Sequence, residues 1–142
     1  MKDRLDKIFS LFIRLRDSDE FGYGNCVTCN KKVYYKEAHC GHFMSRRHLS
    51  TRWDEDNCAL QCVACNLFNQ GRQYEFSLYL GQKRAEHLLN KSRQTVKFTK
   101  SDYLELINKY KLKVKQLENK VSLTQISDGT QSGPQTNRVK NR

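Results

Sequence analysis

Apolar positions near the N-terminus follow the period of an α-helix. The residues that recur there at spacings of three and four are Leu5, Ile8, Phe9, Phe12, Ile13 and Leu15. Such a stripe predicts an amphipathic helix over residues 3–17. The segment 21–25, which reads Phe-Gly-Tyr-Gly-Asn, is rich in turn-forming residues and ends this helix.

Further along the chain, short β-prone runs give way to helical patterns. Val33, Tyr34 and Tyr35 predict one strand, and residues 37–43 continue toward a second. A polar and basic loop follows over residues 44–56. Helical patterns then occupy four segments, which are about 65–71, 74–80, 82–93 and 101–118. This order of elements predicts an α+β fold.

Two Cys-x-x-Cys pairs are the most specific pattern in the sequence. Their members are Cys26, Cys29, Cys62 and Cys65. Four thiolates in two such pairs are the usual ligand set of a tetrahedral structural zinc. The N-terminus has no apolar run typical of a secretory signal, so a reducing compartment is expected, which favours metal over disulfides. The remaining Cys40 and Cys58 are expected to be buried as small apolar side chains, with a metal-ligand role for either one as the alternative.

The composition of the chain indicates what kind of partner it binds. The chain has 142 residues and a formal net charge of +11, which favours a polyanionic partner, most often nucleic acid. Only 37% of the residues are hydrophobic, so the core is small and a structural zinc would help to stabilise it. No apolar run reaches membrane-spanning length, so no membrane partner is expected.

Between and just after the cysteine pairs lie residue types that can activate a water and hold a divalent cation. They are His39, His42, Asn57 and Asn66. Phosphodiester hydrolysis needs a base for the water and charge neutralisation at the phosphate, which an imidazole and one divalent cation can supply. Three arginines in the intervening loop would contact phosphate groups, and these are Arg46, Arg47 and Arg52.

The order of these residues resembles the HNH, or ββα-metal, nuclease motif. His42, Asn57 and Asn66 match its three positions in order. The resemblance implies that His42 is the general base, that Asn57 holds its imidazole in place, and that Asn66 ligates a catalytic Mg²⁺ or another divalent cation. It also implies a small zinc-stapled ββα-metal core, with an N-terminal amphipathic helix and C-terminal helices around it.

Further segments are similar to the NinG/Rap family of lambdoid phage recombination nucleases. They are residues 3–17, residues 41–46, and residues 51–53 followed by Asn57 and residues 61–66. This resemblance implies a structure-selective DNA endonuclease for branched recombination intermediates such as D-loops and Holliday junctions. It also implies a place in the cytoplasm of the phage-infected bacterial host.

Two positions depart from the family patterns. Many HNH enzymes carry an acidic metal ligand directly before the base, where this chain has Gly41. Relatives can carry an aspartate three positions before the base, where this chain has His39. Imidazole is an acceptable metal ligand but brings no negative charge. We therefore expect His39 to complete the metal site and to hold Mg²⁺ less well than a carboxylate would.

Two other functions compete with the nuclease. One is a non-catalytic, zinc-stabilised module that binds nucleic acid, and the other is an adaptor that binds a protein through the lysine-rich C-terminal helix. The nucleic-acid-binding module gives no reason for the spacing of His42, Asn57 and Asn66. A homodimer would suit a symmetric junction, with the helices 3–17 and 101–118 as candidate interfaces.

The expected organisation has four parts. They are an N-terminal helix, a zinc-bound HNH-like nuclease core, a helical extension and a disordered basic tail, over residues 1–20, 21–80, 81–120 and 121–142.

Overall fold

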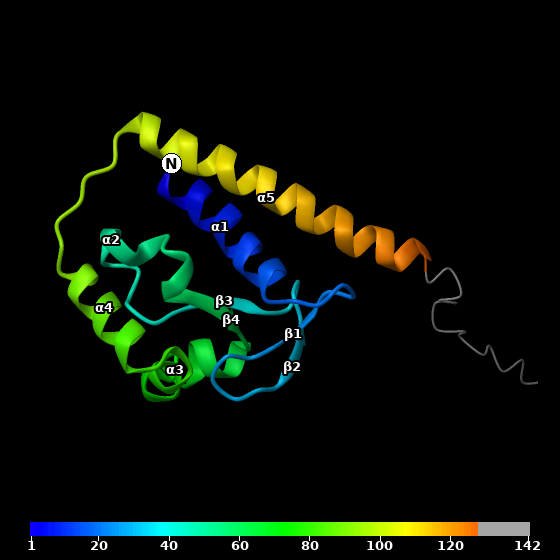
Figure 1. The fold of residues 1–142 in the computed structure, drawn as a ribbon, viewed down its shortest axis with the longest axis horizontal. Coiled ribbons are helices and arrows are strands. Elements are labelled where there is room, and N and C mark those ends of the chain that lie inside the picture. The colour runs from blue at the N-terminus through cyan, green and yellow to red at the C-terminus, as the bar shows by residue number, and fades with distance from the viewer. Residues whose placement is uncertain (128–142) are drawn as a thin grey trace, which may run out of the picture.

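The computed structural model describes residues 1–127 and has an α+β fold with two small antiparallel sheets (Figure 1). This confirms the predicted fold class. The elements in chain order are α1 (Lys2–Arg16), β1 (Tyr23–Asn25), β2 (Lys32–Tyr34), β3 (His39–His42), α2 (Leu49–Arg52), the 3₁₀ turn η1 (Glu55–Asn57), β4 (Cys58–Gln61), the π-helical turn η2 (Ala64–Phe68), α3 (Gln73–Leu80), α4 (Gln82–Ser92) and α5 (Lys100–Ser127).

The N-terminal helix forms as its apolar spacing predicts. α1 buries one stripe of side chains, namely Leu5, Phe9, Phe12, Ile13 and Leu15. The long helix α5 lies along α1 (Figure 1) and adds Ile107, Tyr110 and Val114 to the same core. The rings of Phe9 and Tyr110 meet edge to face, with centroids 4.9 Å apart. Each fully buried large side chain contributes about 1.5–3 kcal/mol, so this helix pair stabilises one side of the β3–β4 hairpin.

The β3–β4 hairpin carries the residues singled out by the sequence. Its antiparallel register pairs His39 with Gln61 and His42 with Cys58. The connection between the strands was expected to be a loop, but it contains α2 and η1. This short helical structure brings Asn57 to the start of β4, where its side chain is fully buried.

α5 is longer than the sequence predicts. The apolar pattern ended near residue 118 and a disordered tail was expected from residue 121, yet the helix continues to Ser127. Val121 explains part of the difference, because it is buried in the α1–α5 core although its neighbours are polar. The rest of the expected tail, residues 128–142, lies outside the described residues. Among residues 1–127, no helix combines the length and apolarity needed to cross a membrane.

Asp6 fastens the loop between β3 and β4 to α1. Its carboxylate accepts hydrogen bonds from Arg52 Nε at 3.0 Å, Arg52 Nη2 at 2.5 Å and Trp53 Nε1 at 2.9 Å. Burial alone would raise the pKa of Asp6, but the hydrogen bonds and charge of Arg52 outweigh it and hold the pKa below the ordinary 3.8. The folded state therefore favours the ionised carboxylate.

Replacing Asp6 with asparagine should destabilise the fold at neutral pH. Hydrogen bonds to charged groups contribute about 1.5–3 kcal/mol, so we expect a loss of that order in the free energy of unfolding. Because the folded-state pKa is lowered, this contribution is present above pH 3.8 and is lost as the pH falls through the folded-state value. Urea unfolding of the wild type and Asp6→Asn across this range measures the difference. Asp3→Asn, an exposed carboxylate on α1, is the control, and an equal effect of both changes would contradict the assignment.

Candidate functional site

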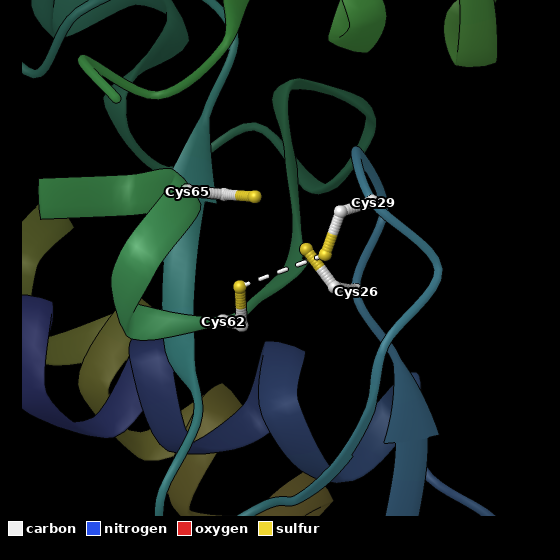
Figure 2. Close-up of side chains that lie close together, drawn as sticks. All are labelled: Cys26, Cys29, Cys62 and Cys65. Atoms are coloured by element: carbon white, nitrogen blue, oxygen red, sulfur yellow. Dashed lines mark hydrogen bonds between the residues drawn. The ribbon is translucent and has the colours of Figure 1, made fainter. Parts of the chain in front are cut away.

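The two cysteine pairs converge on one point. The sulfurs of Cys26, Cys29, Cys62 and Cys65 all lie within 4.8 Å of one another, and Figure 2 shows the four side chains pointing toward a common centre. The Sγ atoms of Cys29 and Cys62 are 3.7 Å apart. A tetrahedral zinc with Zn–S bonds of about 2.3 Å separates its sulfurs by about 3.8 Å. The cluster therefore could hold a metal such as zinc, as the spacing predicts.

Two tight turns build the cysteine cluster. Residues 26–31 form the first, closed by hydrogen bonds from Asn30 N to Cys26 O and from Cys26 N to Lys31 O, both 2.8 Å. The second begins at the end of β4, where the backbone enters η2. Burial would raise the pKa of Cys26, but hydrogen bonds from the Cys62 backbone and from Thr28 outweigh it and lower the pKa to about 6. A thiolate, the form that binds metal, is thus favoured at this position.

His42 ends β3 with its ring fixed by a backbone carbonyl. Its Nε2 lies 3.0 Å from the carbonyl oxygen of Arg52. A carbonyl oxygen can only accept, so Nε2 carries the proton and the neutral ring keeps its lone pair on Nδ1. Burial lowers the pKa of His42 below its ordinary 6.5, more than the carbonyl raises it. The ring is therefore neutral at pH 7, with one nitrogen able to take a proton.

Asn57 does not hold the imidazole as the resemblance implied. Its Oδ1 accepts from Met44 N at 2.7 Å, and its Nδ2 donates to Met44 O and Thr51 O, both at 3.0 Å. Both amide protons are thereby used on the loop backbone. Because Thr51 precedes Arg52, these bonds fix the segment whose carbonyl holds the His42 ring. Asn57 is a positioning residue that acts through this loop.

His39 and Asn66 meet although they are far apart in the sequence. Asn66 Nδ2 lies 3.0 Å from His39 Nδ1. The oxygen and nitrogen of an amide exchange places by rotation, so Asn66 can present its oxygen at this point instead. Adjacent ligands of an octahedral cation with bonds of about 2.1 Å are separated by about 3.0 Å, which matches this pair. The donor set is one imidazole and one amide, without a carboxylate.

A pocket of about 540 Å³ brings the predicted site residues together. It is lined by His39, His42, Asn66 and Arg46, and by Asp6, Gln70 and Gln73 among others. Neither the buried Asn57 nor the four-cysteine cluster is among the residues that line it. Asn66 directly follows Cys65, so a metal in the cysteine cluster would fix the backbone that presents Asn66 to the pocket.

The three loop arginines differ in what they contact. Arg52 is committed to Asp6, as described above, and its side chain is only 17% exposed. Arg46 lines the pocket, and its side chain is 61% exposed, with Asp6 3.6 Å away. Arg47 is exposed beside it. Of the three predicted phosphate contacts, Arg46 and Arg47 thus have exposed side chains that a ligand could contact, while Arg52 is held by Asp6.

The packing around Gly41 leaves no room for the acidic side chain that many HNH enzymes carry at this position. A Cβ atom at this position would lie 2.4 Å from Gln61 Oε1 and 3.0 Å from Gln61 Cβ. Gln61 is itself fixed, because its Nε2 donates to Thr28 Oγ1 at 2.9 Å and to Gly71 O at 2.8 Å. An aspartate at Gly41 would require the link between the cysteine turn and the pocket wall to move.

Sequence reasoning missed two features of the site. The first is the Arg52 carbonyl, which orients His42; a backbone group leaves no signal in residue types. The second is that Cys40 and Cys58 lie beside His42. The possible ligand atoms of these three side chains all lie within 4.8 Å of one another. Cys58 is buried as expected, but Cys40 is only half-buried. The alternation of Cys40 and His42 on one predicted strand could have revealed this second feature.

The fold and the site thus define an α+β protein with a four-cysteine cluster and a pocket that gathers histidine and asparagine side chains. The family model described as Bacteriophage Lambda NinG protein matches residues 1–120. Because this match covers most of the 142 residues, the chain belongs to the NinG family, which confirms that resemblance. No curated protein matches the chain, and no solved structure does.

Proposed function

We propose that the chain is a metal-dependent DNA endonuclease of the HNH class that acts on branched recombination intermediates. The observation that carries the proposal is the arrangement around His42. Its Nε2 is tied to the Arg52 carbonyl at 3.0 Å, and the ring shares a pocket with the paired His39 and Asn66. The β3–β4 hairpin followed by η2 would supply the ββα-metal core. Membership of the NinG family supports a phage protein that works inside the host cell.

His42 would act as the general base. With its proton on Nε2, Nδ1 takes a proton from a water in the pocket, and the resulting hydroxide attacks the phosphorus. The imidazolium that forms keeps its hydrogen bond to the Arg52 carbonyl, which favours the charged ring. Asn57 contributes by holding the backbone that leads to this carbonyl, through its bonds to Met44 O and to Thr51 O.

His39 and Asn66 would hold the catalytic cation. A divalent cation bound there would neutralise developing charge on the phosphate and stabilise the leaving oxygen. Both side chains are neutral, and Asp6, a carboxylate in the pocket lining, is paired with Arg52. The phosphate of the substrate would therefore provide much of the negative charge that Mg²⁺ requires.

The metal requirement of cleavage tests this assignment. His39→Asp adds a negative charge to the cation site, and a gain of about 1.4 kcal/mol would lower the Mg²⁺ concentration for half-maximal cleavage tenfold. His39→Ala should raise that concentration by a similar factor. Cleavage rates measured against Mg²⁺ concentration, with thermal unfolding as a check on folding, give the comparison. An identical Mg²⁺ dependence in all three proteins would show that His39 does not bind the catalytic cation.

Arg47 should contribute to DNA affinity but not to the chemistry. Each lost phosphate contact lowers the slope of log affinity against log salt concentration by about one. We expect Arg47→Ala to weaken binding to any DNA sequence and to reduce this slope by about that amount. Fluorescence anisotropy over a salt series measures the slope. Lys111→Ala removes the same charge from an exposed position on α5 and is the control; an equal change in both variants would place Arg47 outside the DNA interface.

A further inference from the structure

Cys40, His42 and Cys58 form a second cluster of metal-ligating side chains, separate from the four-cysteine cluster. Their ligand atoms all lie within 4.8 Å of one another. The register of the β3–β4 hairpin brings these three side chains together. Residues two apart on a strand share one face, as Cys40 and His42 do on β3. Cys58 pairs with His42 across the two strands, so its side chain lies on the same face.

The donor set selects the kind of ion. Two thiolates and an imidazole bind Zn²⁺ and other thiophilic transition-metal ions, whereas Mg²⁺ prefers oxygen ligands. On binding, each of the two thiols releases its proton to solvent, and the two thiolate charges balance the charge of a divalent ion. Two guanidinium groups lie nearby: Arg16 Nη2 donates to the backbone oxygen of Cys58 at 2.8 Å, and Arg14 lines the same pocket as Cys40.

The cluster is reachable from the pocket. Cys58 is only 2% exposed, but Cys40 and His42 both line the pocket and open the cluster to solvent. A water could fill a fourth position from that side. The Arg52 carbonyl oxygen lies 3.0 Å from His42 Nε2 and 4.0 Å from Cys58 Sγ, so the His42 ring and this thiol approach the same point. A neutral imidazole has one lone pair, so an ion bound to the ring takes up the lone pair that would deprotonate the water.

We propose that Cys40, His42 and Cys58 bind Zn²⁺ or a similar thiophilic ion, and that the bound ion occupies the His42 lone pair and stops cleavage. The metal site follows from the geometry of the cluster alone. The inhibition rests on the proposed function, because it requires His42 to be the base. The residues lining one pocket would then hold an activating cation at His39 and Asn66 and an inhibitory ion at Cys40, His42 and Cys58.

Zinc binding to the full chain tests the site without any DNA. Equilibrium dialysis against buffered free Zn²⁺ should load the four-cysteine cluster first and then a second ion. Cys40→Ala and Cys58→Ala should each lose the second ion, and His87→Ala, at an exposed position on α4, should keep it. Circular dichroism checks folding, and the half-buried Cys40 provides the variant of choice if Cys58→Ala fails to fold. Absence of a second ion in the wild type, or its persistence in the cysteine variants, would overturn the site.

Cleavage in Mg²⁺ with and without added Zn²⁺ tests the inhibition. Each protein is compared with its own zinc-free rate. The wild type should slow by roughly 10² or more, as expected when a general base is lost, and Cys40→Ala should slow far less. An unchanged wild-type rate at a zinc concentration that fills the second site would overturn the inhibition. If no variant cleaves DNA in Mg²⁺, the proposed function fails, while the dialysis result still decides the metal site.

Discussion

Replacing Cys65 with serine should unfold the part of the chain built around β1, β2 and η2. The buried cluster there consists of Cys26, Val33, Ala38, Leu60, Cys62 and Cys65, so half of its members are the thiols themselves. Strands of three residues add little stability. Structural zinc sites contribute about 10–16 kcal/mol in small domains, which is comparable to the whole stability of a protein.

Elemental analysis and thermal unfolding measure this effect together. The wild type should retain a tightly bound zinc, and Cys65→Ser should lose it and melt at a much lower temperature or without a cooperative transition. Hydrogen exchange should place the loss of protection in residues 23–34 and 62–68, with α1 and α5 affected least. Cys40→Ser, outside the four-cysteine cluster, is the control for the chemical change: it should lose only the second ion proposed above and keep the zinc of the four-cysteine cluster. A zinc-free protein that is fully folded would rule out a structural metal.

Replacing His42 with alanine should abolish most cleavage and leave DNA binding nearly intact. Loss of a general base commonly costs ~10²–10⁴ in rate. Arg46 and Arg47, which we propose contact phosphate groups, remain in this variant, so affinity for the junction should change little. The effect is measured in single-turnover reactions with DNA saturated by protein, which separates chemistry from binding.

A second histidine provides the control for His42. His48 lies in the same loop region and is not among the residues that line the pocket. We expect His48→Ala to cleave at a rate close to that of the wild type. Near-wild-type turnover by His42→Ala would contradict its role as the base, and unfolding of that variant would be visible in its thermal melt.

Local patterns predicted the elements that are determined by neighbouring residues. The spacing of Leu5, Phe9 and Phe12 was sufficient for α1, because a helical stripe depends on residues three and four apart. The cysteine cluster was also predictable, since tight turns between paired cysteines leave few geometries for the thiols. The meeting of His39 with Asn66 followed from the family resemblance rather than from periodicity.

Contacts between distant segments could not be predicted. The Arg52 side chain was expected to face phosphate, but Asp6 on α1 binds it instead. Both residues are charged, and either could have faced solvent. Their pairing depends on how α1 packs against the loop, which the sequence pattern does not show. Asn57 was likewise assigned to His42, whereas the loop folds so that Met44 and Thr51 take its hydrogen bonds.

Cleavage of a synthetic four-way junction is the most direct test of a metal-dependent nuclease. The purified wild type is treated with a chelator that removes weakly held cations, checked for retained zinc, and incubated with an end-labelled junction and a linear duplex. We expect no cleavage until Mg²⁺ or Mn²⁺ is restored, and then cleavage of the junction in preference to the duplex. Firm binding to the junction without cleavage under any divalent cation would contradict it, and would leave a zinc-stabilised module that only binds DNA.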